Sequence, residues 1–452
     1  MAEFQKFRYK SLEELKTDID RLGLNIPVTE DLSPLSKPVK IGKKIAPNAF
    51  STLPMEGFDC LADGTPSDLT RQRYLRYAAG GAGLIWFEAC AVVHEGRSNP
   101  CQMIFSEENL NAYKALVADM DQASMDSVGY KSLKILQLSH SGRYSRPNDY
   151  SKREPVIVKH DPEFDVRVGI DETYPVQTDE ELEALIPHFV KNAILAKEAG
   201  LDGVEVKTCH RYLVSELLSS YNRPGKFGGS LEKRASLPIQ IIKEIRKACG
   251  EEFIIASRFS VFDYHPYPVG FGASLEKGFP IADEGLELAK MLVSAGVDLL
   301  SASGGDVIKD PHVTRPFNLG VIGGKTPPEH PLESVFRQMD FARQMKAVSG
   351  DVPYISTCYS WLQEYLPNIG AAVIAAGGID MVGFGRGSIA YPDMPKDVLT
   401  DKVNRKKVCI ACSKCTQIMR AGAKIGCPIR RPEIYAPIYR EVCAEIKENA
   451  GK

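Results

Sequence analysis

Four cysteines near the C-terminal end of the sequence have the spacing of a metal-ligand set. Cys409, Cys412, Cys415 and Cys427 form a C-x2-C-x2-C-x11-C array, followed at once by Pro428. Gaps of two residues let three thiolates of one short turn face a common centre, which the fourth closes from a nearby loop. Four convergent thiolates suit an iron–sulfur cluster or structural zinc. Zinc sites usually pair two C-x2-C units, whereas three cysteines crowd together here, so the spacing favours a [4Fe-4S] cluster.

The composition of the chain narrows the classes of protein it can belong to. Its 452 residues, 44% of them hydrophobic, can bury a large core. A net charge of −2 gives no electrostatic reason to expect nucleic acid or an anionic membrane as a partner. No apolar run approaches the roughly 20 residues of a membrane span, and the charged N-terminal segment does not resemble a secretory signal. We therefore expect a cytoplasmic protein whose thiols are reduced.

A repeating pattern of helix, glycine and apolar strand runs through most of the chain. Four times a helix pattern ends in Ala-Gly or Gly-Gly and leads directly into a short apolar strand, in segments 78–92, 196–209, 292–305 and 374–387. Glycine supplies a left-handed helix end, and a continuous apolar strand is typical of a strand buried on both faces. Further strands are predicted at 47–53, 133–140, 253–260 and 352–358. Helix-compatible stretches between them include 105–121, 179–199, 231–248, 282–296 and 332–348.

Eight strands alternating with helices predict an α/β fold, a (β/α)8 TIM barrel with a C-terminal cysteine-rich segment. No G-x-G-x-x-G follows any strand, so a dinucleotide-binding Rossmann unit is not indicated. We predict an N-terminal helical extension over 1–40, the barrel over 41–400 and the four-cysteine extension over 401–452.

Polar residues gather where chemistry occurs in such barrels, at the carboxyl ends of the strands. Long loops also follow several strands, at 141–176, 261–281 and 306–331, and loops of this length commonly form binding walls. We expect His140 to be a buried histidine and not a catalytic one. The other polar or glycine positions at strand ends are Gln137, Lys207, His210, Arg258, Gly304, Gly305, Gly385 and Arg386.

The strings QLSHSGRYS (137–145) and HRYLVSELLSSYNRPGKFGGSLEKR (210–234) resemble those of the Old Yellow Enzyme family of flavin-dependent ene-reductases. ASRFS and VGFGRGSIAYPDMP follow in the family's order, so the resemblance covers about positions 45–400. The cysteine array resembles the family's iron–sulfur branch, which includes 2,4-dienoyl-CoA reductases and trimethylamine dehydrogenase. Those relatives continue with a flavodoxin-like and nucleotide-binding half beyond the cluster. We expect a separate electron-transfer protein to replace that half, or the reaction to dispense with it.

The resemblance implies FMN bound at the barrel mouth. On this reading Pro54, Met55 and Ala89 pack beside the isoalloxazine ring, and Gln137 hydrogen-bonds its pyrimidine edge. Arg258 would lie near N1 and the C2 carbonyl, where a fixed cation favours the anionic reduced flavin.

The resemblance also places the FMN phosphate. The family's glycine-rich turn after the seventh strand is Ser356-Thr357-Cys358 in this chain. The Thr357 hydroxyl is therefore expected to offer a contact that backbone N–H groups usually make. The remaining contacts would come from backbone N–H groups and a guanidinium, at Gly304, Gly305, Gly385 and Arg386.

On the substrate side the resemblance points to four residues. His210 stands at the second of two positions, three residues apart, where the family hydrogen-bonds a substrate carbonyl oxygen. Lys207 replaces the usual histidine at the first position, and an ammonium could stabilise an oxyanion or bind an acidic substrate group. Arg211, where the family usually has glycine, adds a second cation. Tyr212 matches the family's proton donor to the α carbon.

Three functions remain open at this stage. The first is an FMN- and [4Fe-4S]-containing ene-reductase that acts on a small unsaturated carbonyl compound, with electrons from NAD(P)H or through the cluster. The second is an amine or N-methyl dehydrogenase of the trimethylamine dehydrogenase type. The third is a non-catalytic barrel with structural zinc. The identity of the substrate and a homo-oligomeric state are not determined by the residues.

Overall fold

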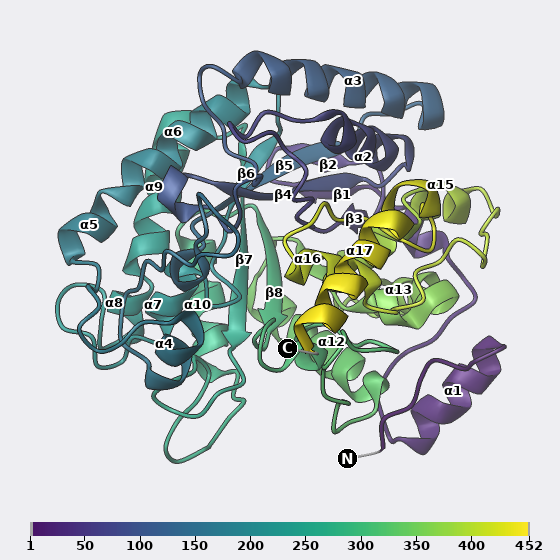
Figure 1. The fold of residues 1–452 in the computed structure, drawn as a ribbon. Coiled ribbons are helices and arrows are strands. Elements are labelled where there is room, and N and C mark those ends of the chain that lie inside the picture. The colour runs from purple at the N-terminus through teal and green to yellow at the C-terminus, as the bar shows by residue number, and fades with distance from the viewer. Residues whose placement is uncertain (1–2, 451–452) are drawn as a thin grey trace.

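Eight parallel strands close into a barrel in the computed structural model, which describes residues 3–450 (Figure 1). Around the barrel the order is β10-β3-β4-β5-β6-β7-β8-β9, so neighbours in sequence are neighbours in space. This confirms the predicted (β/α)8 architecture. The strands are β3 (Phe50–Thr52), β4 (Leu84–Ala91), β5 (Leu133–Ser139), β6 (Gly203–Val206), β7 (Ile254–Phe262), β8 (Leu299–Gly304), β9 (Tyr354–Ser356) and β10 (Met381–Phe384).

Helices form the outer layer, as the alternating pattern predicted. The glycines expected at helix ends, Gly81, Gly200, Gly296 and Gly377, have φ angles from +71° to +99°, a region that favours glycine. The long helices are α2 (Asp68–Ala79), α3 (Leu110–Val128), α6 (Leu185–Glu198), α9 (Ser236–Cys249), α10 (Asp283–Ser294), α12 (Pro331–Val348) and α13 (Leu366–Ala375). The short ones are α4 (Pro162–Val168), α5 (Asp179–Glu183), α7 (Leu213–Leu218), α8 (Leu231–Arg234), α11 (Pro311–Thr314), α14 (Arg386–Ala390) and α15 (Met394–Leu399).

Side chains close one end of the barrel and leave the other end open. An apolar cluster that includes Trp86, Ile135 and Ile355 fills the interior. The antiparallel hairpin of β1 (Val39–Ile41) and β2 (Lys44–Ala46) adds Ile41 and Ala46 to the same cluster. Because this hairpin immediately precedes β3, it covers the amino ends of the strands. The accessible end is therefore the carboxyl end, where barrels carry their chemistry.

Both terminal segments pack on the barrel. Leu15 and Ile19 of α1 (Leu12–Arg21) are buried in the main core. The C-terminal helices α16 (Lys414–Arg420) and α17 (Pro432–Ala450), yellow in Figure 1, lie against the barrel. Ile425 N–H donates to the Gly57 carbonyl at 2.7 Å, just beyond β3. The cysteine segment is thus fixed to the rim of the barrel, while the domain limits at 40 and 400 stay predictions.

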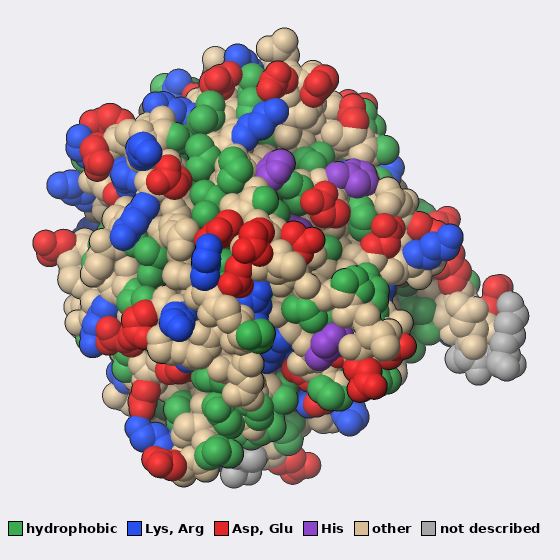
Figure 2. All heavy atoms as spheres, turned by 90° about the vertical axis from the view of Figure 1, so that its left-hand side faces the viewer, with side chains coloured by type: hydrophobic (Ala, Val, Ile, Leu, Met, Phe, Trp, Pro, Cys, Tyr) green, Lys and Arg blue, Asp and Glu red, His purple; other side chains and the backbone are tan. Residues whose placement is uncertain are grey.

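The face of the molecule seen in Figure 2 carries hydrophobic, polar and charged side chains. Acidic and basic side chains are interspersed over the face shown in Figure 2, as expected for a chain with a net charge of −2. No helix among residues 3–450 is long and apolar enough to cross a membrane.

Candidate active site

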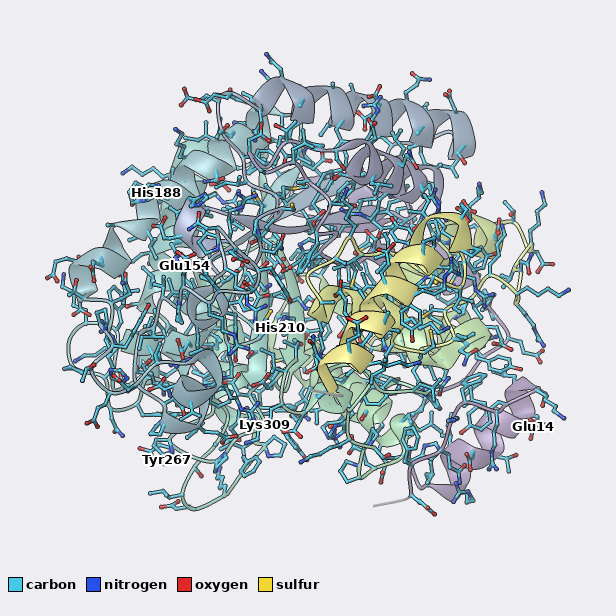
Figure 3. All side chains as sticks on the ribbon, viewed as in Figure 1. Glu14, Glu154, His188, His210, Tyr267 and Lys309 are labelled. Atoms are coloured by element: carbon cyan, nitrogen blue, oxygen red, sulfur yellow. The ribbon has the colours of Figure 1, made fainter. Side chains whose placement is uncertain are left out.

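A cavity of about 540 Å³ opens at the carboxyl ends of the strands. Loops that follow several strands and the C-terminal segment contribute to its wall, and His210 lies near the centre of the molecule (Figure 3). Ten of the residues predicted for the site line this one cavity: Pro54, Met55, Gln137, Lys207, His210, Tyr212, Arg258, Thr357, Gly385 and Arg386. The structure thus brings together residues that lie as far apart as 54 and 386 in the sequence. Their individual roles stay predictions.

Tyr212 is held by a carboxylate and a cation. It is the N-cap of α7, and its hydroxyl donates to Glu56 Oε1 at 3.3 Å. The Nζ atom of Lys207 lies 3.7 Å from the centroid of the Tyr212 ring, within the range of a cation–π contact. Burial and the Glu56 carboxylate raise the pKa of Tyr212. Tyr212 therefore keeps its proton until a stronger base develops beside it.

His210 is a neutral hydrogen-bonding group at the same wall. Its Nε2 atom lies 2.9 Å from Ser303 Oγ. Burial and the positive charges of Arg258 and Lys207 hold the pKa of His210 well below its ordinary value. Burial likewise lowers the pKa of Lys207. An uncharged imidazole can donate one hydrogen bond to a carbonyl oxygen.

The prediction for Arg211 needs a correction, because the structure turns this side chain away from the cavity. His210 and Arg211 have φ angles of +68° and +57°, unusual for non-glycine residues. The two left-handed residues reverse the chain after β6, so Arg211 points to the opposite side. There it pairs with Asp161 Oδ2 at 3.1 Å and Asp263 Oδ2 at 3.4 Å. Arg211 is a buried structural cation and not a substrate ligand.

The cavity residues fit an anionic, flat cofactor. Arg386 donates from Nη2 to the Pro316 carbonyl at 2.7 Å, while its buried Nη1 atom has no hydrogen-bond partner among the described residues. The buried Nε atom of Arg258 also lacks one there. Buried guanidinium groups are costly unless an anion or carbonyl accepts from them. A Cβ atom at Gly385 would lie 2.9 Å from Met55 Sδ, so a larger residue would have to displace the Met55 side chain, whereas glycine leaves its backbone accessible. These features fit the phosphate and ring of FMN.

A buried carboxyl group lies behind the cavity lining, bonded to Gln137, and was missed in the sequence. Gln137 Nε2 donates to Glu205 Oε2 at 2.7 Å. Glu205 is fully buried on β6, and burial raises its pKa to about 7. The sequence signal that could have revealed this group is a glutamate inside an otherwise apolar strand.

Three predicted flavin contacts do not line the cavity. Ala89 is buried in β4, and its carbonyl accepts from Gln102 Nε2 at 2.9 Å. The Gly304 carbonyl accepts from Thr314 Oγ1 at 3.0 Å. Gly305 has a φ of +86°, which glycine adopts readily. These positions shape the backbone behind the wall, and none of the three is among the residues that line the cavity. Instead Val307, Ile308 and Thr314 form that part of the lining.

All four predicted cysteine ligands line one small hollow beside the cavity. They are free thiols, and burial raises the pKa of Cys409 to about 12. Over residues 3–450, no group of three or more His, Cys, Asp or Glu side chains has a geometry that would hold a metal ion. The cluster therefore stays a prediction. Arg386 and Cys415 line both the hollow and the large cavity, so the two spaces share a wall.

The charge of the cavity lining was the largest feature missed. Glu56 is its one carboxylate, and the Tyr212 and Ser98 hydroxyls donate to it. Half of the cations come from long loops that were predicted to form walls, but nothing in the sequence of these loops marks which side chains face inward. The cationic lining residues are Arg146, Arg153, Arg167, Lys207, Arg258, Arg315, Arg386 and Arg420.

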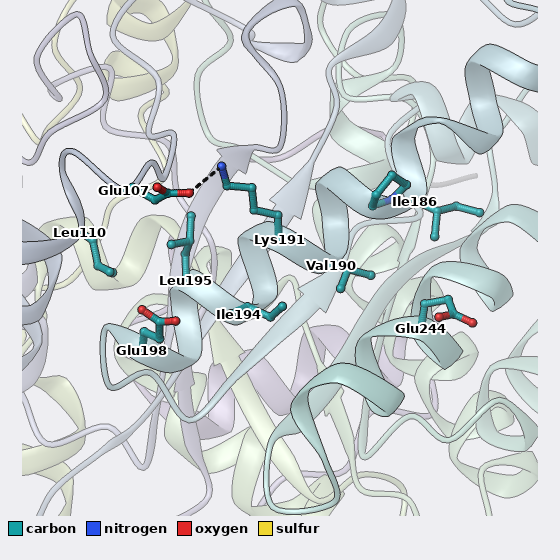
Figure 4. A pocket seen from close by; sticks show the side chains of 10 residues that line it. Glu107, Leu110, Ile186, Val190, Lys191, Ile194, Leu195, Glu198 and Glu244 are labelled. Atoms are coloured by element: carbon teal, nitrogen blue, oxygen red, sulfur yellow. Dashed lines mark ion pairs between the residues drawn. The ribbon is translucent and has the colours of Figure 1, made fainter.

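A second hollow lies on the outer surface of α6, away from the strand ends (Figure 4). Ile186, Val190 and Ile194 line it, and the ion pair of Lys191 with Glu107 at 3.0 Å crosses its edge. It holds no arrangement of residues for catalysis.

The fold and the cavity fit the class of flavin-dependent oxidoreductases built on a barrel. The chain belongs to the NADH:flavin oxidoreductase / NADH oxidase family, whose model matches residues 34–299. It is 30% identical over 378 residues to NADH oxidase of Thermoanaerobacter brockii, covering 83% of this chain and 52% of that protein. It is 29% identical over 414 residues to cinnamate reductase of Clostridium sporogenes, covering 87% and 57%. The chain thus spans about half the length of these curated relatives.

Solved structures share the fold. A 2-naphthoyl-CoA reductase in complex with 2-naphthoyl-CoA superimposes with a TM-score of 0.71 at 24% identity, covering 91% of this chain and 58% of that one. Histamine dehydrogenase from Rhizobium sp. gives a TM-score of 0.67 at 20% identity, covering 87% and 52%. One neighbour is a reductase and the other an amine dehydrogenase, so the fold alone does not choose between the two reactions.

Proposed function

We propose that this chain binds FMN in the cavity and reduces a C=C bond conjugated to a carbonyl group. The observation that carries the proposal is the convergence of Lys207, His210 and Tyr212 on one cavity that also holds the unsatisfied guanidinium atoms of Arg258 and Arg386. FMN, when bound, supplies a hydride to the β carbon of the substrate. The reductant is NAD(P)H, or electrons delivered through a [4Fe-4S] cluster held by the four cysteines, from a separate electron-transfer protein.

The side chains of the chain have three tasks in this reaction. Lys207 and His210 donate to the carbonyl oxygen and stabilise the negative charge that develops there. Tyr212 gives its proton to the α carbon, so that hydride and proton together saturate the bond. The Lys207 ammonium, beside the tyrosine ring, stabilises the phenolate that remains until solvent returns the proton.

The alternative reaction, amine oxidation, is disfavoured by charge. An amine carries a positive charge near neutral pH, and apart from Arg258 and Arg386, which fit the cofactor, it would enter a lining with six cations and one carboxylate. Repulsion among unscreened like charges in a partly buried space is costly. An unsaturated carbonyl compound meets hydrogen-bond donors in the same place.

The test is a pair of half-reactions followed anaerobically by stopped-flow absorbance. Protein purified with its flavin is reduced by NADH, NADPH or dithionite, and is then mixed with a panel of conjugated enones, enoates and enoyl thioesters. We expect reoxidation by members of this panel and no bleaching of the oxidised flavin by methylamines. Bleaching by amines without reoxidation by any enone derivative would overturn the proposal, and a colourless, zinc-loaded protein would support the non-catalytic reading.

A further inference from the structure

The cations around the cavity are almost entirely unpaired. Of the eight cationic lining residues, only Arg167 forms an ion pair within the described part of the chain, with Glu163 at 3.4 Å. Arg258 and Arg386 fit the cofactor, and Lys207 fits the reacting carbonyl. Arg315 donates to Thr416 Oγ1 at 2.7 Å. Positive charge at Arg146, Arg153, Arg315 and Arg420 is thereby left without an assigned anion, and of these residues Arg315 already has an uncharged side-chain acceptor.

The other three arginines line the part of the cavity that includes Tyr150. The Arg146 guanidinium carbon lies 4.3 Å from the centroid of the Tyr150 ring. The Tyr150 hydroxyl donates to the Met419 carbonyl at 3.0 Å, which joins the loop after β5 to the end of α16. A Cβ atom at Gly422 would lie 2.3 Å from the Tyr150 ring, so the two segments are in close contact. Arg420, beside Met419, thus reaches the same wall as Arg146.

The electrostatics of this wall agree with its geometry. Burial and the positive charge of Arg146 lower the pKa of Arg153, so the two cations lie near enough to repel each other. Burial lowers the pKa of Arg420. Three cations held together without a counter-ion favour the binding of an anion.

The three arginines also lie at a different depth from the reacting group. Lys207 is buried, whereas Arg153 and Arg420 are exposed. An anion bound by these arginines is therefore nearer to solvent than the carbonyl held by Lys207 and His210. Such an anion belongs to a second group of the substrate and is not the carbonyl that is polarised during reduction.

We infer that the substrate carries an anionic oxygen group, bound at the cavity mouth by Arg146, Arg153 and Arg420. This inference rests on the proposed function, because it names the substrate class of the same cavity. Two sources share this chemistry: a carboxylate at the far end of the unsaturated substrate, and the phosphates of a thioester carrier. Both form charge-assisted hydrogen bonds with guanidinium groups.

The test compares charged and neutral substrates in matched variants. The variants are Arg153→Gln and Arg420→Gln, and the control is Arg343→Gln on α12, outside the cavity lining. Substrates are an enone bearing a distal carboxylate, its methyl ester and an enoyl-CoA thioester. We expect each cavity variant to raise KM for the anionic substrate about tenfold. The kcat values and the KM for the methyl ester should stay nearly unchanged. Arg343→Gln should behave as wild type.

The arms of the experiment separate the two sources. A rise in KM for the carboxylate identifies a carboxylate anchor, and a rise confined to the thioester identifies the carrier phosphates. The inference would be overturned if the wild type had equal KM values for the methyl ester, the carboxylate-bearing enone and the enoyl-CoA thioester, and if these values were unaltered in the variants.

Calorimetric binding keeps this inference separate from the proposed function. Holoprotein is titrated with benzoate, benzamide and coenzyme A, none of which is turned over. Tighter binding of benzoate or coenzyme A than of benzamide, lost in Arg153→Gln and Arg420→Gln, supports the inference even if no enone is reduced. Equal or undetectable binding of all three probes refutes it, whatever the enzyme reduces.

Discussion

The ammonium group of Lys207 lies 3.7 Å from the centre of the Tyr212 ring, on the side of the cavity where His210 also lies. The two residues are connected electrostatically, because a cation over the ring stabilises a phenolate more than a phenol. Burial raises the pKa of Tyr212 and lowers that of Lys207. The pair is therefore arranged to hold the proton on Tyr212 until a carbanion demands it.

Removing the Tyr212 hydroxyl should separate proton transfer from flavin reduction. In Tyr212→Phe we expect reoxidation of reduced flavin by an enone to slow about 10²-fold or more, the usual effect of losing a general acid. Reduction by NAD(P)H should stay near the wild-type rate. Stopped-flow measurement of both half-reactions checks this. The control is Tyr221→Phe, whose hydroxyl donates to Glu284 outside the cavity, and equal slowing in both variants would argue against the assignment.

The charge of Lys207 should set the alkaline side of the pH–rate profile. Burial lowers its pKa from the ordinary 10.5, so the ammonium is lost at a lower pH than on an exposed lysine, and the rate should fall as pH rises through that value. Lys207→Arg keeps the charge at higher pH and should shift the alkaline limb of the profile to higher pH. Lys207→Met should abolish this limb. An unchanged limb in both variants would show that another group is responsible.

Glu205 should make stability depend on pH. Burial raises its folded pKa from 4.5 to about 7, so the folded protein retains a proton that the unfolded chain releases. Protonated Glu205 contributes its full share to the free energy of unfolding below pH 4.5. This contribution is lost as the pH rises through about 7, which lowers the free energy of unfolding by on the order of 3 kcal/mol. Glu205→Gln still accepts from Gln137 without a charge.

We therefore expect Glu205→Gln to exceed the wild type in unfolding free energy at pH 8, and the difference to shrink towards pH 5. Denaturant unfolding at both pH values measures it. The control is Glu252→Gln, whose exposed carboxylate pairs with Lys43. A difference that is the same at pH 5 and pH 8 would contradict the predicted ionisation of Glu205.

The cysteine hollow should hold iron and sulfide. Substituting Cys409, Cys412, Cys415 or Cys427 by serine should abolish bound iron in protein purified anaerobically, because each thiolate is one ligand of a four-ligand set. Cys443→Ser, in α17 of the same segment, should retain it. Metal and acid-labile sulfide assays check this, and zinc without sulfide in the wild type would replace the cluster by a structural zinc site.

The architecture was predictable because its signal is local and repeated. Each strand is a continuous apolar run buried on both faces, and glycines such as Gly200 and Gly377 mark the helix ends that precede two of them. His140 was also predicted correctly: it is buried, and its Nδ1 atom accepts from Gly142 N–H at 3.0 Å. The short stretch before the first barrel strand gives no such period, so the β1–β2 hairpin was missed.

The direction of side chains in irregular segments was not predictable. Arg211 was assigned to the substrate side because it adds a cation where the family usually has glycine, yet two left-handed residues turn it into the protein. The wall formed by Arg146 and Arg420 depends on contact between segments that are more than 260 residues apart, made through Tyr150 and Met419. Neither spacing nor composition records such a contact.

The buried pairs of Arg211 with Asp161 and Asp263 connect three of the loops that surround the cavity. Arg143, bonded to Glu216, adds a further tie between two of them. Loops fastened to one another in this way lose little conformational entropy when a ligand arrives. Recognition would then depend on how well a molecule matches a prearranged frame, and an ill-fitting analogue would be rejected at entry, because these three loops have little freedom to adjust around it.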